Sequence, residues 1–307
     1  RFNSPQSFLH RLFSYDIFEK KLTTMILIAD GGSTKADWIA INKDKTEAFR
    51  VRTLGLNPEV NSTKELTDRI IHMFQLINIK KDVEEIYFYG AGCGTPAAIK
   101  ILQNVLESIF INAKVFVAED MLAAVYAASG KAPAIVCILG TGSNSCYFDG
   151  ESLHMKTVSL GYIVMDEASG NHFGKILLKE YFYGKMPKRI AAKFASEFNL
   201  DADFVKKNLY KEQNPNMYLA TFAQFMFAFK EDKYIKRIIK KGFQEFFKYR
   251  VLPFEKGIET PLYFIGSIAF YFRDLLEKVA QKNNLTVTDV IQRPIDNLLE
   301  YHRNNIQ

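Results

Sequence analysis

Two segments of the chain share a pattern that constrains the fold more than any other feature of the sequence. Residues 26–35 read ILIADGGSTK, and residues 135–144 read IVCILGTGSN. In each, an apolar, β-branched run leads into a turn of Gly, Ser and Thr, and a stretch of alternating apolar and polar residues follows. Each segment therefore predicts a buried strand, a polar turn and a second strand. Two such hairpins in one chain indicate a duplicated lobe.

The remainder of the first half alternates predicted strands with predicted helices. Strands are expected at 85–89 and 115–117, and a second amphipathic helix is expected over 99–109. The first amphipathic helix is expected from apolar residues that recur on one helical face, at Leu66, Ile70, Phe74 and Ile77. Because strands separated by helices of this length are usually joined in parallel, the sequence predicts an α/β fold.

The second half is mainly helical. It reads as one helix after another from residue 171 to residue 252, returns to strand at 262–265, and continues as helix over 267–281. A last helix is expected after Pro294. With 307 residues, of which 48% are apolar, the chain is long enough for two lobes that each have a core.

We expect four segments along the chain. They are a leader or extension at 1–24, a first α/β lobe at 25–130, a second α/β lobe with a helical insertion at 131–293, and a C-terminal helix at 294–307 that packs back on the first lobe. The first segment lacks the apolar stretch and the small-residue cleavage site of a secretory signal.

Composition argues against several classes of function. The net charge of +6 is spread over helical faces rather than gathered in a basic stripe, so nucleic acid is not an expected partner. No apolar run approaches the roughly 20 residues of a membrane span. Cys93, Cys137 and Cys146 show neither CxxC spacing nor an even count, which favours a reducing, cytoplasmic setting. The Phe-rich stretch at 216–247 is expected to belong to the core rather than to an interface. The sequence does not decide whether the protein forms a homodimer.

The first turn has the composition of a phosphate cradle, Asp30-Gly31-Gly32-Ser33-Thr34-Lys35. Its glycines would let the backbone approach a phosphate, its N–H groups and hydroxyls would donate to the oxygens, and Lys35 would add positive charge. A P-loop requires GxxxxGK[ST] followed by a helix, whereas a second strand follows here. The alternative is an ordinary hairpin turn.

The second turn strengthens the interpretation of the first. It reads Gly140-Thr141-Gly142-Ser143-Asn144. Two such turns in duplicated lobes can face each other and hold a polyphosphate between them, although each alone is also explained as a hairpin.

Two acidic positions are candidates for chemistry. Asp120 follows a predicted strand, where it could be a general base at the carboxyl edge of a parallel sheet or only the cap of the next helix. Asp166 and Glu167 lie in a loop of small residues that could hold Mg²⁺ through a carboxylate and water. The alternative for this loop is a solvated acidic helix start.

A last candidate is the junction of strand, turn and helix at Gly266 and Ser267. The missing side chain of the glycine would admit a flat base or a ribose against the backbone. A plain turn between a strand and a helix explains the same residues.

Taken in order, these motifs resemble the actin/Hsp70/sugar-kinase superfamily. They are DGGSTK, ED at a strand end, GTGSN, a DE-containing loop and a strand–GSIA–helix. Within that superfamily the set is most similar to the N-acetylglucosamine kinase family, which is grouped with the BadF/BadG/BcrA/BcrD ATPases. The likeness runs from Met25 to about His302. It implies two RNase-H-like, actin-like ATPase lobes with a central nucleotide cleft, MgATP between them, and phosphoryl transfer to the 6-hydroxyl of an amino sugar.

The resemblance also implies roles for particular residues. Asp30 through Thr34 and Lys35 match the first phosphate motif, and Gly140, Thr141, Gly142 and Ser143 match the second. The adenosine motif is matched by Gly266 and Ser267. Asp120 matches the family's catalytic base, while Asn57, Asp120, Asn144 and Asp166 match positions that contact the sugar. Asp30 matches a position that orders Mg²⁺ through water, and Asp166 is the second candidate for that ion from the composition of its loop.

The chain departs from the family in the acidic loop, which usually reads GDEGS. Met165 and Ala168 occupy both glycine positions here. Where those glycines require a positive φ, a side chain costs on the order of 1 to 2 kcal/mol. This departure supports a non-catalytic sugar or nucleotide sensor as an alternative, and the family grouping supports a BadF-type ATPase that acts on a protein partner as another.

Overall fold

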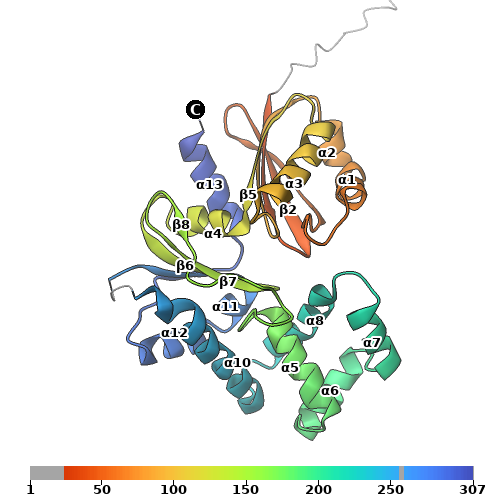
Figure 1. Ribbon diagram of the computed structural model, residues 1–307, viewed down its shortest axis with the longest axis vertical. Coiled ribbons are helices and arrows are strands. Elements are labelled where there is room, and N and C mark those ends of the chain that lie inside the picture. The colour runs from red at the N-terminus through yellow and green to blue at the C-terminus, as the bar shows by residue number, and fades with distance from the viewer. Residues whose placement is uncertain (1–23, 256–258, 307) are drawn as a thin grey trace, which may run out of the picture.

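The computed structural model describes residues 24–255 and 259–306, so the expected leader at 1–24 lies outside the described residues except for Thr24. Two five-stranded sheets form the centres of two lobes (Figure 1). None of the helices in these two ranges is long and apolar enough to cross a membrane.

The first sheet has the strand order β3-β2-β1-β4-β5. Its strands are β1 (Met25–Gly31), β2 (Lys35–Asn42), β3 (Glu47–Leu54), β4 (Val83–Gly90) and β5 (Lys114–Glu119). The first three form an antiparallel meander, and β4 and β5 extend the sheet in parallel with β1. The helices of this lobe are α1 (Thr63–Ile71), α2 (Phe74–Asn78) and α3 (Pro96–Ile109), and α4 (Asp120–Ala128) leads to the second lobe.

The second sheet repeats this topology. Its order is β10-β9-β6-β7-β8, and its strands are β6 (Ala134–Leu139), β7 (Ser143–Phe148), β8 (Leu153–His154), β9 (Leu262–Ile265) and β10 (Asp289–Ile291). Strands β6, β7 and β8 form the antiparallel meander, and β9 and β10 run parallel to β6. The duplication predicted from the two hairpin segments is thus confirmed strand by strand.

Additional helices distinguish the second lobe. Between β8 and β9 lie α5 (Gly170–Phe182), α6 (Lys188–Glu197), α7 (Ala202–Tyr210), α8 (Pro215–Ala223), α9 (Phe225–Ala228), α10 (Lys233–Phe246), a π-helical turn η1 (Phe247–Val251) and a 3₁₀ turn η2 (Leu252–Phe254). Between β9 and β10 lie α11 (Ser267–Tyr271) and α12 (Arg273–Lys282). The Phe-rich stretch falls in this insertion, where Phe222, Phe243 and Phe246 are buried in the core as predicted.

Alternate residues of each strand point to opposite faces of the sheet, and both faces of the first sheet are covered by apolar side chains. Leu27 and Ala29 belong to the core that β1 shares with α1 and α3. Ile26 and Ile28 belong to a second core, which contains residues of α4 and of the last helix, α13 (Ile295–Asn305). Asp30 follows in the same alternation as Ile28, so its side chain lies on the α4 and α13 side of the sheet.

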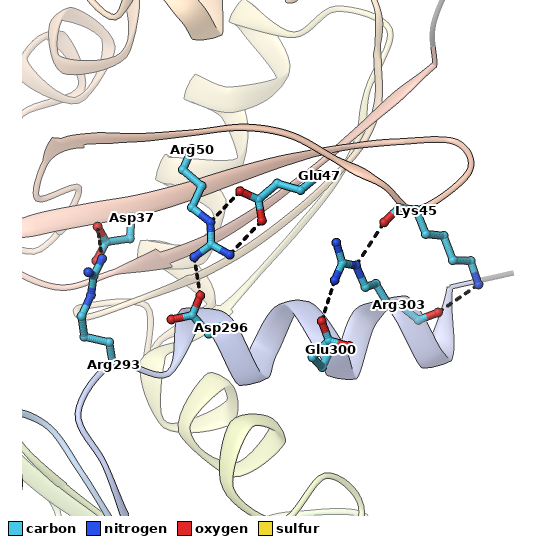
Figure 2. Close-up of polar contacts among 8 residues, drawn as sticks. All are labelled: Asp37, Lys45, Glu47, Arg50, Arg293, Asp296, Glu300 and Arg303. Atoms are coloured by element: carbon cyan, nitrogen blue, oxygen red, sulfur yellow. Dashed lines mark hydrogen bonds and ion pairs between the residues drawn. The ribbon is translucent and has the colours of Figure 1, made fainter.

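The last helix crosses from the second lobe and lies against the β2–β3 hairpin of the first (Figure 2). Arg50 of β3 pairs with Asp296 at the start of α13. At its other end, Lys45 donates to the carbonyl oxygens of Arg303 and Ile306, at 2.9 and 2.7 Å. Polar contacts therefore attach both ends of α13 to the first lobe.

Local periodicity was misleading in two places. The apolar series from Leu66 to Ile77 predicts one continuous face, but α1 ends at Ile71, α2 begins at Phe74, and the Phe74 side chain is 76% exposed. The extended backbone of Met73 between the two helices breaks the helical phase. The helix expected over 267–281 is likewise divided at Phe272. The strands β3, β8 and β10 were not predicted, because β3 alternates with charged residues and the other two are short.

A close contact between α5 and α8 generates a stability prediction. A methyl group at Gly174 would lie 1.9 Å from the carbonyl oxygen of Leu219, and backbone atoms of a helix cannot yield as a side chain can. We expect Gly174→Ala to lower the free energy of unfolding by about 3 kcal/mol in urea denaturation. Lys179→Ala, at an exposed position of the same helix, should change it by less than about 0.5 kcal/mol. Equal stability of the two variants would contradict this packing.

A buried histidine in α13 generates a pH prediction. Burial lowers the pKa of His302 to about 4, and its Nε2 lies 3.0 Å from the hydroxyl of Tyr89. Between pH 6.5 and 4 the unfolded chain binds a proton that folded His302 does not, so stability should fall with decreasing pH, by up to about 1.4 kcal/mol per unit.

The measurement is the free energy of unfolding at several pH values. His302→Leu should have a shallower slope than the wild type across this window. Tyr89→Phe keeps the imidazole and removes only its partner hydroxyl, so it should keep the steeper slope. The same slope in all three proteins would show that His302 does not titrate in this way.

Candidate active site

The two polar turns predicted from the sequence meet in the structure. The Oγ1 atoms of Thr34, in the β1–β2 turn, and Thr141, in the β6–β7 turn, are 3.1 Å apart. One threonine belongs to each lobe, so the contact joins turns that are far apart in the chain. This convergence is the geometric condition for a shared phosphate site.

A third turn packs directly against the second one. Gly266, between β9 and α11, has a φ of 114°, and its N–H donates to the carbonyl oxygen of Ile291 at 2.9 Å. A methyl group at this position would lie 2.4 Å from the carbonyl oxygen of Leu139, which precedes the β6–β7 turn. Only glycine permits both the backbone conformation and this close approach. The turn at 266–267 is therefore held next to the turn at 140–143.

Two carboxylates lie at the edge of the first sheet. Asp30 lies at the carboxyl end of β1 and Asp120 directly after β5, and parallel strands bring these ends to one edge. Burial raises the pKa of Asp30 to about 7, and the negative charges of Asp120 and Asp37 add to this effect. Burial also raises the pKa of Asp120 to about 6, against the opposing effect of the N–H groups of Met121 and Asp120 itself. Paired carboxylates of this kind are typical of functional sites.

Asp120 is not the cap of α4. The N-cap position is occupied by Glu119, whose side chain makes no capping hydrogen bond, and Asp120 is the first helical residue. Its carboxylate nevertheless interacts with the N–H groups of Met121 and of Asp120 itself, so a structural role at the start of α4 stays an alternative to the role of base.

The acidic loop is folded into the protein. Asp166 is buried, has a φ of 69°, and accepts a 2.8 Å hydrogen bond from Nδ2 of Asn171. Burial raises its pKa. A methyl group at Gly142 would lie 2.8 Å from Oδ2 of Asp166, so the loop lies directly against the second turn. The alternative of a solvated acidic helix start is therefore wrong as well.

A solved structure decides the family. The crystal structure of a candidate N-acetylglucosamine kinase from Porphyromonas gingivalis is 36% identical to this chain, with a TM-score of 0.85. The match covers 92% of this chain and 99% of that one. The chain belongs to the N-acetylglucosamine kinase family. No model of a known protein family matches the sequence, and no curated protein matches it.

More distant structures share the fold. A candidate N-acetylglucosamine kinase from Chromobacterium violaceum is 14% identical, with a TM-score of 0.67, over 91% of this chain and 99% of that one. A ROK family glucokinase from Streptomyces griseus, solved with glucose and AMPPNP, is 13% identical, with a TM-score of 0.54, over 91% of this chain and 99% of that one. The predicted fold class, two actin-like α/β lobes with helices added to the second, is confirmed.

The departure from the family's acidic loop has different consequences at its two positions. Ala168 is buried and has a φ of 58°, a backbone conformation that favours glycine, so its methyl group costs on the order of 1 kcal/mol. Met165 is not among the described residues with a positive φ. Its sulfur accepts from the N–H of Leu160 and from Nη2 of Arg250, both at 3.3 Å. The methionine is thus part of the packing of the loop.

Two asparagines that match the family's sugar positions lie beside the turns. Nδ2 of Asn57 donates to Oγ of Ser33 at 3.3 Å, which ties Asn57 to the first turn. Asn144 lies on β7 in the same alternation as Cys146 and Phe148, which pack with residues of α4. Asn144 therefore lies on the side of the second sheet that faces the helix beginning with Asp120.

Sequence reasoning missed three charged residues near the site. Glu119 directly precedes Asp120, and its pKa is raised by burial and by the charge of Asp120. Asp37 is a buried acid in a strand whose other inward residues are apolar, and that contrast was a usable signal. Arg250 is buried in the helical insertion and pairs with Glu167, which no local pattern indicates.

The ion pair between Arg250 and Glu167 generates a prediction. Nε of Arg250 lies 3.2 Å from Oε2 of Glu167, and the arginine side chain is only 2% exposed. Removal of one partner of a buried pair leaves a charge without compensation, so Arg250→Met should lower the free energy of unfolding by about 3 kcal/mol. The double variant Arg250→Met/Glu167→Leu should recover more than half of this loss. A loss that is equal in the single and double variants would show that packing, rather than charge, accounts for it.

Proposed function

We propose that the protein is an ATP-dependent sugar kinase that transfers the γ-phosphate of ATP to the 6-hydroxyl of N-acetylglucosamine. The observation that carries the proposal is the contact of the turns at Thr34 and Thr141 beside the carboxylate of Asp120. Membership of the N-acetylglucosamine kinase family supports the choice of sugar. The shared fold with a glucokinase solved with glucose and AMPPNP is consistent with it.

The residues of the three turns fit a nucleotide. A methyl group at Gly140 would meet no atom within 4 Å, so the backbone of the second turn is open to a ligand. Hydroxyls of Ser33, Thr34 and Thr141 lie at the two turns that converge, where they can donate to phosphate oxygens. The space left by the missing side chain of Gly266 is filled by the backbone of Leu139 and Gly140, so the expected admission of a base or ribose at that point is wrong. The turn at Gly266 and Ser267 would instead lie beside the adenosine. Gly140 to Ser143 and Asp30 to Lys35 would bind the phosphates.

The acidic groups fit a magnesium ion bound through water. Among the described residues, no set of three or more His, Cys, Asp or Glu side chains could hold a metal ion alone. Mg²⁺ in phosphotransferases is usually held by one or two carboxylates, by water and by the phosphates of the substrate. Asp30 and Asp166 would supply the carboxylates. When bound, Mg²⁺ neutralises the charge that develops on the phosphate oxygens.

Asp120 would act as the general base. Its pKa of about 6 leaves most of the carboxylate ionised at neutral pH, yet makes it more basic than an exposed aspartate. It would accept the proton of the sugar hydroxyl as that oxygen attacks, while Asn57, Asn144 and Asp166 orient the sugar. The remaining contribution of the protein is positioning and charge stabilisation by N–H groups, hydroxyls and Lys35.

The alternative of an ATPase that drives a protein partner has no support from the cysteines. Cys93, Cys137 and Cys146 are buried in three different hydrophobic clusters, and burial raises the pKa of each thiol. Protonated thiols in separate cores are poor ligands for a shared iron–sulfur cluster.

A substitution of the base tests the proposal. Asp120→Asn keeps the size and polarity of the side chain but removes its basicity, so we expect kcat to fall by about 10³-fold. The affinity for MgADP should stay within a few-fold of the wild type. The measurement is ADP release coupled to an indicator reaction, across a panel of N-acetylglucosamine, glucosamine and glucose, with calorimetry for MgADP.

Asp149→Asn serves as the control, because this aspartate is exposed and pairs with His154 at the far end of β7. It should phosphorylate the sugar at the rate of the wild type. Sugar phosphorylation by Asp120→Asn at that same rate would refute the role of Asp120. Binding of sugar by the wild type without release of ADP would instead favour the sensor.

A further inference from the structure

One buried carboxylate of the first lobe has no part in the proposed chemistry. Asp37 is 8% exposed and lies directly opposite Asp30 in the pairing of β1 with β2. Residues opposite each other in a pair of strands point to the same face, so the two aspartates are neighbours on the α13 side of the sheet. Like charges at such positions repel, and the charge of Asp37 contributes to the raised pKa of Asp30.

Two arginines from different parts of the chain balance the charge of Asp37. Nε of Arg52, on β3, lies 2.6 Å from Oδ1 of Asp37, and Nη2 of Arg293 lies 3.0 Å from the same oxygen. Figure 2 shows Arg293 reaching Asp37 from the segment that leads into α13. The positive charge of Arg293 also acts on Asp30, where it lowers the pKa and so opposes the effect of burial.

Arg293 lies where the chain returns from the second lobe to the first. It follows β10, which ends at Ile291, and precedes α13, which packs on the first lobe. The carbonyl oxygen of Ile291 accepts the hydrogen bond from the N–H of Gly266. The short stretch of backbone from Ile291 to Arg293 therefore connects the Gly266 turn of the second lobe to the first lobe. The connection runs through the Arg293 side chain, which pairs with Asp37, the neighbour of Asp30.

We propose that Arg293 is a positioning residue that couples the two halves of the nucleotide site. Its ion pair with Asp37 fixes the crossover segment, and with it the turn at Gly266, relative to the phosphate turn at Asp30. The inference rests on the proposed function in one respect, because it takes the ligand of these turns to be a nucleotide. Neither Arg293 nor Asp37 contacts that ligand in this arrangement.

The geometry favours a local effect on binding over an effect on global stability. The Arg293 side chain is 46% exposed, and ion pairs with one exposed partner usually contribute about 1 kcal/mol or less to folding. Other contacts, including Arg50 with Asp296 and Lys45 with Arg303, hold α13 on the first lobe independently. Loss of Arg293 would thus leave the helix in place and release only the segment next to the Gly266 turn.

The test compares Arg293→Met with Arg50→Met, which removes a different ion pair between the first lobe and α13. Calorimetry should show MgADP affinity about 10-fold weaker for Arg293→Met, the size of effect typical of residues that orient the ligands of an ion or a phosphate. KM for MgATP should rise by a similar factor, whereas KM for the sugar and the melting temperature should stay near their wild-type values. Arg50→Met should leave MgADP affinity unchanged.

Two further variants separate positioning from a structural role. Arg293→Lys keeps the charge and should recover part of the affinity. Asp37→Asn removes the pair with Arg293 together with that of Arg52, so it should also weaken MgADP binding. The double variant should be no weaker than Asp37→Asn, which already lacks the Asp37–Arg293 interaction. Wild-type affinity in Arg293→Met, or equal weakening in Arg50→Met, would overturn the proposal.

The same measurements distinguish this proposal from the proposed function. A wild-type protein that binds MgADP but phosphorylates no sugar would refute the kinase activity alone, and the MgADP affinities would still decide the role of Arg293. A wild-type protein that does not bind MgADP would refute both.

Discussion

The contact between Thr34 and Thr141 is the interaction around which the site is arranged. It brings the β1–β2 turn of the first lobe against the β6–β7 turn of the second, and each turn is held in place by its own sheet. The loop containing Asp166 packs on Gly142, and the Gly266 turn packs on Leu139, so both depend on the position of the second turn. Separation of the two threonines would therefore part the groups of the second lobe from Asp30 and Asp120, which lie at the edge of the first sheet.

Electrostatics at this contact are unusual because several acids lie where burial weakens the screening of their charges. Asp30, Asp120 and Asp166 all have raised pKa values, with burial as the largest cause. Such an arrangement destabilises the empty protein slightly and favours the binding of positive charge. A magnesium ion and the positive side chains around the turns would relieve it, so the same feature that strains the free protein serves the proposed function.

The C-terminal helix gives the two lobes a second covalent connection besides α4. Its apolar residues complete a core with β1 and β2, and its polar ends attach to the β2–β3 hairpin. The segment before it contacts Asp37, the neighbour of Asp30, through Arg293 and contacts the Gly266 turn through Ile291. A change in the relative position of the lobes must therefore act on this crossover, and the role proposed for Arg293 depends on this connection.

Much of the fold followed from local patterns. Local patterns predicted the duplicated hairpins, the strands β4 and β5, and the position of Asp120 as an acid at a sheet edge. They could do so because strand periodicity and turn chemistry depend on consecutive residues. The break between α1 and α2, which leaves Phe74 exposed, could not be predicted because the apolar spacing continues across it. The pairs Thr34–Thr141, Asp37–Arg293 and Glu167–Arg250 join residues from distant parts of the chain. The sequence indicated that the two turns can face each other, but no local pattern identifies the individual partners. Only the tertiary structure decided which charges are balanced and which side chains meet.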